Sequence, residues 1–301
     1  MNNPCPHVEL TGVSKTFGKG SGQKTVLHQI DLSIRRGERV ALLGASGSGK
    51  STLMRLINGL HRADSSSQGL VKINGQILQE SGRPSRQIRA IRSRIATIFQ
   101  QFNLVNRLQV ITNVSVGAVY QLPLWRSLVG LFPKGIELRS LEALDQVGIL
   151  DQAYKRARLL SGGQQQRVAI ARAIAQGAEL ILADEPIASL DPESSRKVME
   201  LLVDLNTKQG CTVLVSLHQV AVALRYCDRV VALKAGRIVY DGPTAQLTES
   251  QLKDLYGSDS DLVFDELETP PVPSDQATTS VKTVSAINTA PSRSSYEVYA
   301  S

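Results

Sequence analysis

Residues 44–52 read GASGSGKST, and they stand between an apolar run, Arg39–Leu43, and a helical pattern, Ser51–Leu60. This order predicts a buried strand, a glycine-rich turn and a helix start in immediate succession. Glycine permits backbone angles that a Cβ would forbid, so such a turn can aim successive N–H groups at an anion. The free N–H groups of the following helix add to the attraction. The stretch therefore predicts a phosphate cradle; the alternative is a glycine turn that only connects a strand to a helix.

Each residue type in this cradle has a predicted role. Backbone N–H groups surround the phosphates, Lys50 reaches the β- and γ-phosphates of a nucleotide, and the Ser51 hydroxyl ligates Mg²⁺. The predicted phosphate-binding residues are consecutive: Gly44, Ala45, Ser46, Gly47, Ser48, Gly49, Lys50, Ser51 and Thr52.

Two carboxylates end another apolar run. Residues 179–186 read ELILADEP, which predicts a buried strand with Asp184 and Glu185 at its carboxyl end. In an open α/β sheet, ligands bind beyond that end of the strands. We predict that Asp184 holds Mg²⁺ through water and that Glu185 polarises the attacking water, because hydrolysis needs a base held in line with the γ-phosphate. The alternative is a solvated acidic turn after a strand.

A second anion-binding turn is predicted at Leu160–Gln164, which reads LSGGQ and opens a helix. Ser161, Gly162 and Gly163 lie where the free N–H groups of the helix point outward. One nucleotide does not need two such turns from one chain, so we expect the turns to face two nucleotides in a head-to-tail dimer. The alternative is a plain helix start with Ser161 as its N-cap.

Strand and helix patterns alternate along most of the chain, which predicts an α/β fold with a parallel, helix-covered sheet. Asn74-Gly75 signals a hairpin, so an antiparallel part is expected near the N-terminus. Helical patterns between Gln100 and Leu160 predict a helical insertion. Strands are predicted at 8–17, 26–34, 38–43, 70–73, 76–78, 95–99, 180–183, 212–216, 229–233 and 238–240, and helices at 51–59, 85–94, 112–120, 136–147, 163–176 and 192–208.

Length and composition bound the class of protein. The 301 residues suffice for one large domain or two small ones. No run approaches the roughly 18 apolar residues of a membrane span, and the N-terminus lacks a signal-peptide pattern, so we expect the chain to stay in the cytoplasm. Cys5, Cys211 and Cys227 show neither metal spacing nor a disulfide framework. Cys211 and Cys227 are predicted to be buried thiols.

Charge is distributed unevenly. The whole chain carries +7, whereas residues 258–301 hold two bases and seven acids, a net of −5 that leaves +12 for the rest. A basic body suits nucleotides, nucleic acid or an anionic membrane face, and charge alone does not choose among them. Residues 258–301 are rich in Ser, Thr, Pro and acids without periodicity, which predicts a disordered tail. Both a solvated extension and a regulatory segment over the basic body fit this composition.

Taken together, these motifs resemble the ATP-binding subunit of an ABC transporter. GASGSGKST, LSGGQ and ILADEP stand in that family's order, and the resemblance covers about residues 7–257. It implies ATP with Mg²⁺ as ligands and a P-loop NTPase fold over residues 1–257. This fold would comprise a RecA-like core at about 1–100 and 165–257, an N-terminal antiparallel β subdomain, and an inserted α-helical subdomain at about 101–164.

The resemblance also implies further site residues. Gln100, directly after the predicted strand 95–99, resembles the Q-loop glutamine and is favoured over Gln101 for that reason. Ser189–Asp191 resembles the D-loop, His218 the switch histidine that bonds the γ-phosphate, and Phe17 the aromatic residue stacked on adenine. The implied catalytic residues are Glu185, His218 and Gln100; the implied metal site is Ser51, Gln100 and Asp184; the further implied ATP contacts are Phe17, Ser161, Gly162, Gly163, Gln164 and Asp191.

A finer resemblance is to the phosphonate-import subgroup. It rests on FNLVNRL at 102–108, LWRSLVGLFPK at 124–134 and ALDQVGI at 143–149. It implies a peripheral ATP-hydrolysing subunit at the cytoplasmic face of the inner membrane that powers uptake of phosphonate, or alternatively of phosphite, phosphate or another small anion. The implied partners are a second copy of the chain, two transmembrane permease subunits and an extracytoplasmic phosphonate-binding protein.

An alternative of another class is a soluble ABC-type ATPase that acts on nucleic acid. The basic charge favours it, but the sustained heptads of the long coiled coils that such ATPases carry are absent from the sequence. We therefore expect no nucleic acid among the partners.

Overall fold

The computed structural model describes residues 6–18, 20–123 and 132–257, which all lie in one compact unit, residues 1–268. Its central sheet has six strands in the order β11-β10-β3-β9-β8-β7. The strands from β10 to β7 run parallel, and β11 pairs antiparallel at one edge. These strands are β3 (Arg39–Leu43), β7 (Ile95–Ile98), β8 (Leu180–Asp184), β9 (Thr212–Ser216), β10 (Arg229–Lys234) and β11 (Arg237–Pro243).

A second, antiparallel sheet has five strands in the order β2-β1-β4-β5-β6. The predicted hairpin is confirmed: Asn74 and Gly75 both have positive φ, 50° and 74°, as a two-residue turn of this twist requires. The two sheets together confirm the predicted P-loop NTPase fold with an antiparallel N-terminal part. The strands are β1 (Val8–Phe17), β2 (Lys24–Ile34), β4 (Leu70–Ile73), β5 (Gln76–Glu80) and β6 (Arg83–Pro84).

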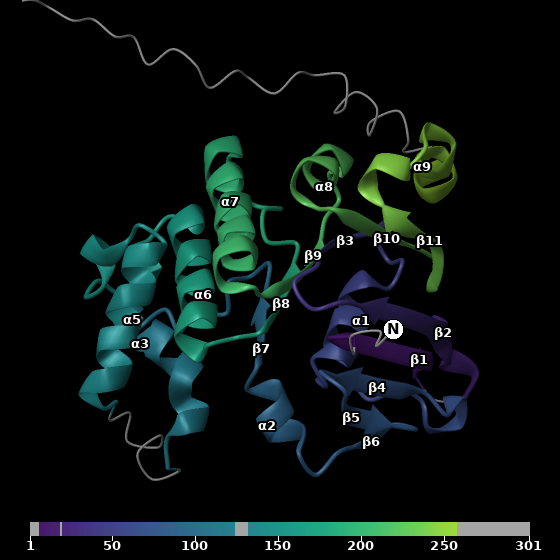
Figure 1. The fold of residues 1–301 in the computed structure, drawn as a ribbon, viewed down its shortest axis with the longest axis horizontal. Helices are drawn as coiled ribbons and strands as arrows, with labels where there is room; N and C mark the ends of the chain where they lie inside the picture. The colour runs from purple at the N-terminus through teal and green to yellow at the C-terminus, as the bar shows by residue number, and fades with distance from the viewer. Residues whose placement is uncertain (1–5, 19, 124–131, 258–301) are drawn as a thin grey trace, which may run out of the picture. The chain divides into compact units, whose positions relative to one another are not determined.

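Helices surround the parallel sheet (Figure 1), and α3, α5 and α6 pack against one another beside β7. The predicted domain limits near residues 100 and 165 stay predictions. The described helices are α1 (Lys50–Ile57), α2 (Ile88–Arg92), α3 (Val110–Ser115), α5 (Lys134–Gln146), α6 (Gly162–Gln176), α7 (Pro192–Gln209), α8 (Val220–Tyr226) and α9 (Glu249–Tyr256). Short 3₁₀ turns lie at Gly20–Gly22, Ser65–Ser67, Val116–Gln121, Leu150–Gln152, Ala157–Leu159 and Thr244–Gln246.

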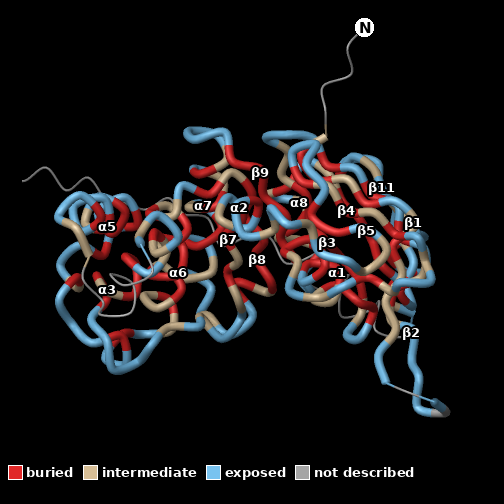
Figure 2. Tube along the Cα trace, turned by 90° about the horizontal axis from the view of Figure 1, so that it is seen from below, coloured by how far each residue is buried: buried red, intermediate tan, exposed pale blue. Residues whose placement is uncertain are grey.

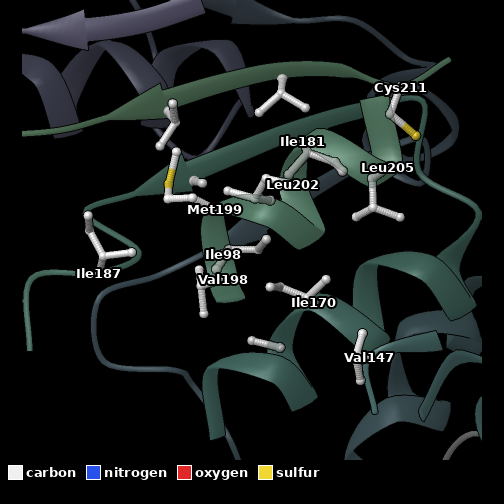
Figure 3. Close-up of a cluster of buried hydrophobic side chains, with 14 of the residues drawn as sticks. Ile98, Val147, Ile170, Ile181, Ile187, Val198, Met199, Leu202, Leu205 and Cys211 are labelled. Atoms are coloured by element: carbon white, nitrogen blue, oxygen red, sulfur yellow. The ribbon is translucent and has the colours of Figure 1, made fainter. Parts of the chain in front are cut away.

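The parallel sheet is buried on both faces (Figure 2), as a sheet of this type requires. Side chains of β3 alternate between two hydrophobic clusters: Val40 and Leu42 face α1 and the antiparallel sheet, whereas Ala41 and Leu43 face the cluster that includes α6 and α7. Figure 3 shows part of the second cluster, in which Ile181 of β8 lies near Leu202 of α7. The sandwich therefore holds the carboxyl ends of its strands in fixed positions.

Some helices differ from the prediction. The helix predicted at 85–94 is only α2, because Ser85 forms a local turn with its Oγ accepting from Gln87 N–H at 3.2 Å. The helix predicted at 112–120 changes to 3₁₀ geometry after α3; here Gly117 lies so close to α6 that a Cβ would be 2.4 Å from the Arg172 carbonyl oxygen. The sequence did not predict α8 and α9.

Two further predictions have different outcomes. Cys211 and Cys227 are buried thiols, as predicted, and burial raises the pKa of Cys227 to about 12. The predicted disorder of residues 258–301 lies outside the described residues.

Candidate functional site

The loop of residues 44–49 joins β3 to α1, as predicted, and two of its glycines are required by close neighbours. Gly44 has φ 146°, and a Cβ there would lie 2.3 Å from the Leu233 carbonyl oxygen of β10. Gly49 has φ 110°, and a Cβ there would lie 2.7 Å from Leu27 Cδ2 of β2. Both the backbone angles and the space therefore exclude larger residues at these positions.

The same loop is bonded to the turn between β10 and β11. Gly236 N–H donates to the Ser48 carbonyl oxygen at 3.0 Å, and the Gly236 carbonyl oxygen accepts from His28 N–H of β2 at 2.9 Å. A Cβ on Gly236 would lie 2.1 Å from the Val26 carbonyl oxygen. The loop, the last hairpin and the antiparallel sheet thus meet at one point.

Lys50 begins α1, and its side chain turns back over the loop. Its Nζ donates to the carbonyl oxygens of Gly44 at 2.6 Å and Ala45 at 3.3 Å, and the residue is only 4% exposed. Burial lowers the pKa of Lys50, while the carboxylates of Glu185 and Asp184 act in the opposite direction. The one ammonium group of the loop therefore lies in the field of both predicted acidic residues.

Ser51 and Asp184, two of the three predicted metal ligands, lie in direct contact. Ser51 Oγ donates to Asp184 Oδ1 at 3.1 Å, and Asp184 is 8% exposed. Gln100 lies on the turn after β7, which neighbours β8, so it shares this edge of the sheet. It is exposed and makes no hydrogen bond to either group within the described part of the chain.

Glu185 and His218, two of the three predicted catalytic residues, are also brought together. Glu185 Oε1 lies 2.6 Å from His218 Nε2, although the residues belong to the turns after different strands, β8 and β9. Glu185 has φ 50°, which is unusual for a residue with a side chain and is held by surrounding contacts. One face of the arrangement stays open to ligand, since the His218 side chain is 43% exposed.

Ser216, the last residue of β9, is a site residue that the sequence did not reveal. Its buried Oγ donates to Asp184 Oδ1 at 2.8 Å and accepts from Glu185 N–H at 2.9 Å. One hydroxyl therefore orients the carboxylate predicted to hold the metal and anchors the backbone of the predicted base, Glu185. The only sequence signal for it is that Ser216 ends a predicted strand at the same edge as Asp184, with which it is in register.

Ser161 and Gln164 form the start of α6. Ser161 Oγ accepts from Gln164 N–H at 3.3 Å, and Gln164 Oε1 accepts from Ser161 N–H at 3.0 Å, so the pair is a capping box. Ser161 is therefore the N-cap of α6, as the alternative interpretation predicts. This cap uses the N–H groups of Ser161 and Gln164 and is compatible with an anion at the N–H groups of Gly162 and Gly163. Gly163 is required here, since a Cβ would lie 2.5 Å from Ser194 Oγ of α7.

Asp191 caps α7 next to this turn. Its Oδ1 accepts from Ser194 N–H at 2.9 Å, and the hydrogen bonds from Ser194 lower the pKa of Asp191. Gly162 lies against Leu190, since a Cβ on it would be 3.4 Å from Leu190 Cδ2. The turn Ser161–Gln164 and the segment Ser189–Asp191 therefore form one surface. Within the described residues, this surface makes no hydrogen bond or ion pair to residues 44–52.

Phe17 ends β1 opposite Lys24 of β2, the strand that touches the loop at Gly49. The residue is 37% exposed, and its ring lies edge-to-face with His61 at 5.3 Å between centroids and has Lys15 Nζ 5.0 Å from its centre. An exposed aromatic ring near a phosphate loop is what base stacking needs.

Comparisons with known proteins identify the family of this chain. A family model described as "ABC transporter" matches residues 27–188. The chain is 54% identical to Phosphonates import ATP-binding protein PhnC 1 of Cupriavidus metallidurans, over 84% of this chain and 88% of the relative. It is also 54% identical to Phosphonates import ATP-binding protein PhnC 2 of Pseudomonas savastanoi pv. phaseolicola, over 86% and 91%.

Solved structures show the same fold. The ATP-binding cassette MJ0796, a dimer in a post-hydrolysis state with ADP and Pi bound, has a TM-score of 0.68 and 34% identity, and the match covers 79% of this chain and 98% of that one. Another dimeric structure of that cassette has a TM-score of 0.69 with the same identity and coverage. With the loop, the paired carboxylates and the capped LSGGQ helix in the geometry described above, the chain belongs to the ABC transporter family, among its ATP-binding proteins.

Proposed function

We propose that this protein is the ATP-hydrolysing subunit of an importer and that it energises the uptake of phosphonate. The observation that carries the chemistry is the contact of Glu185 with His218 beside Lys50, Ser51 and Asp184. The support for the cargo is the printed name of the relatives, which are phosphonate-import ATP-binding proteins at 54% identity.

In the proposed mechanism the loop N–H groups and Lys50 bind the β- and γ-phosphates of ATP. Mg²⁺ would be held by Ser51 and Asp184, with Gln100 from the neighbouring turn; hydroxyl and carboxylate oxygens are the donors this ion prefers, and the ion would neutralise phosphate charge. The donors present fit the ion, since Asp184 offers a carboxylate oriented by two hydroxyl groups.

Glu185 is the proposed base for the attacking water. Its carboxylate would accept the water proton as the water attacks the γ-phosphorus and the bond to the β-phosphate oxygen breaks, which releases ADP. Before ATP binds, His218 Nε2 holds Glu185 Oε1. With ATP bound, the same nitrogen would turn to the γ-phosphate and leave the carboxylate free for the water. Positioning of this kind supplies most of the catalysis in phosphoryl transfer. Phe17 would stack on the adenine.

Two copies would bind two ATP molecules between them. Each site would join residues 44–52 of one copy to Ser161–Gln164 of the other, with Asp191 nearby at the same surface. The dimeric state of the solved cassette with ADP and Pi supports this arrangement. Neither half alone encloses the γ-phosphate, so ATP would close the dimer and hydrolysis would let it open.

The remaining partners follow from the importer assignment. Two transmembrane permease subunits would dock near Gln100, and an extracytoplasmic binding protein would deliver the cargo; the protein itself would be peripheral on the cytoplasmic face of the inner membrane. In the described ranges, each helix is too short or too polar to cross a membrane.

Transport by the assembled complex tests the proposal. The protein is co-produced with the permease and binding-protein subunits of a phosphonate importer, and uptake of a labelled phosphonate is measured with phosphite and phosphate as competitors. Phosphonate uptake that depends on ATP and resists both competitors supports the assignment. Uptake that phosphite suppresses at lower concentration would move the cargo to phosphite, and the absence of any ATP-dependent uptake would contradict the importer role.

A further inference from the structure

A row of arginines without ion pairs lies on α2 and on the turn that precedes it. Residues 83–94 contain five arginines and no acidic residue. Arg86, Arg89 and Arg92, here called the arginine face, repeat at a spacing of three and are all exposed, whereas Ile91 is 2% exposed and Ile88 packs against the core. The segment is therefore amphipathic, with its apolar side already buried within the protein.

The arginine face lacks the acidic partners that the cations of α7 and α9 have. On α7, Lys197 pairs with Glu193 at 2.5 Å and Arg196 with Glu200 at 2.9 Å, and α9 carries a similar pair. Across the residues that the structure describes, the three arginines of the face make no ion pair and no side-chain hydrogen bond. Arg89 and Arg92 are neighbours three residues apart on α2, where like charges repel, so the helix itself gains nothing from them.

The basic surface continues beyond α2. The end of α1 lies beside it, because a Cβ on Gly59 would be 3.2 Å from Ile88 Cδ1. Arg55 and Arg62 at this end are exposed, and Leu60 between them is 46% exposed. In Figure 1, α2 lies at the lower edge, between α3, α5 and α6 on one side and the antiparallel sheet on the other, and α8 and α9 lie at the opposite edge.

We propose that the arginine face binds the anionic lipid headgroups of the membrane to which the protein is recruited. This inference rests on the proposed membrane role, and β7 links α2 directly to Gln100, where we place the permease. Clusters of Lys and Arg on an amphipathic segment are attracted to anionic leaflets, and long arginine side chains reach headgroups while their stems cover apolar surface. The contact would orient the ATPase on the bilayer before and between its encounters with permease.

Vesicle sedimentation with the purified full-length chain tests this proposal. The vesicles contain phosphatidylcholine alone or phosphatidylcholine with phosphatidylglycerol. We expect binding only to the anionic vesicles, and loss of binding near 1 M salt, where the Debye length falls to roughly 3 Å. Each arginine near an anionic surface contributes about five-fold in affinity, so R86Q/R89Q/R92Q should bind on the order of one hundred-fold more weakly, and R89Q alone about five-fold.

The matched control removes the same number of charges elsewhere. R196Q/K197Q/K208Q takes three cations from α7, each of which already pairs with an acid one turn away. Both triple variants should keep the ATPase rate of the wild type, which separates this test from a test of the importer assignment. Equal binding to neutral and anionic vesicles, or equal losses in the two triple variants, would overturn the proposal. So would an arginine-dependent binding to DNA duplex as tight as that to vesicles, which would make the face a nucleic-acid site.

Discussion

Replacing Ser216 by alanine removes the hydroxyl that joins the two carboxylates of the site. In the wild type this group donates to Asp184 Oδ1 at 2.8 Å and accepts from Glu185 N–H at 2.9 Å, and Ser216 is fully buried. Alanine fits the same space, so the variant should fold. What changes is that the Glu185 N–H loses its partner and that Asp184 retains only Ser51.

Two effects of different size are expected. A hydrogen bond to a charged group contributes about 1.5–3 kcal/mol, and an unpaired N–H costs about 1–3 kcal/mol, so the free energy of unfolding should fall by about 3 kcal/mol. Glu185 is held at φ 50° and should relax when its backbone anchor is lost. A shift of about 1 Å in a reacting group costs on the order of 10²-fold in rate. We therefore expect kcat for ATP hydrolysis to fall on the order of 10²-fold, with a smaller change in KM because Lys50 is untouched.

Urea denaturation and steady-state ATP hydrolysis measure the two effects separately. The matched control is Ser115→Ala in α3: Ser115 is 2% exposed, donates to the Ile111 carbonyl oxygen at 2.9 Å and contacts Ser140 Oγ at 2.9 Å. It should lose stability and keep kcat. If S216A loses stability but hydrolyses ATP as fast as S115A, then Ser216 does not position Glu185 and the reasoning is refuted.

Four other changes test separate parts of the structure. Glu185→Gln should keep ATP binding, lower turnover by about 10²–10⁴-fold and yield an ATP-loaded dimer in gel filtration; wild-type turnover would remove Glu185 from its role. Lys50→Ala should weaken ATP binding at least about tenfold in calorimetry, since a charged contact is lost, and an unchanged affinity would contradict the phosphate cradle. Gly163→Ala should lower the urea denaturation midpoint, because its Cβ would lie 2.5 Å from Ser194 Oγ. The overlap should reduce the free energy of unfolding by about 1–3 kcal/mol, and adding Ser194→Gly to the same chain should restore part of that loss. Burial, and to a smaller extent the charge of Arg36, lowers the pKa of His7 in the folded protein. The unfolded chain therefore binds the proton more readily, and the free energy of unfolding should fall as the pH drops below about 6.5. Urea midpoints measured across this pH range should show a smaller fall in His7→Gln, and an equal fall would exclude His7 as the source.

Local signals predicted the elements that depend on a few adjacent residues. Asn74-Gly75 forms a turn because both residues accept positive φ. Gly44–Thr52 folds as predicted because the sequence before it indicates a strand and the sequence after it indicates a helix. By contrast, α8 has an apolar, β-branched sequence, VAVALRY, that carries no clear helical pattern. It is a helix because it packs between α7 and β3, which is a tertiary effect.

Within the site, too, the sequence predicted the residues of contiguous motifs but not the contacts between distant residues. Lys50 and Ser51 follow from a contiguous motif, but the contact of Glu185 with His218 joins residues 33 positions apart. No spacing rule reveals such a contact, and only the resemblance to a family pointed to His218. Ser216 was missed because a serine at a strand end is ordinary in sequence, and its role appears only when β8 and β9 are seen in register.

The hydrogen bond from Gly236 N–H to Ser48 in the loop of residues 44–49 has a consequence for the unfolding of the protein. Ser48, the last hairpin and β2 share one set of main-chain hydrogen bonds, so the loop cannot loosen unless both sheets also yield at that point. Three segments far apart in the sequence, namely β2, the loop at Ser48 and the turn at Gly236, therefore support one another at this point. A truncated chain without β10 and β11 would therefore keep the entire glycine motif and its contacts with β2 but lose the Gly236 N–H that bonds Ser48 and the strand that packs against Gly44.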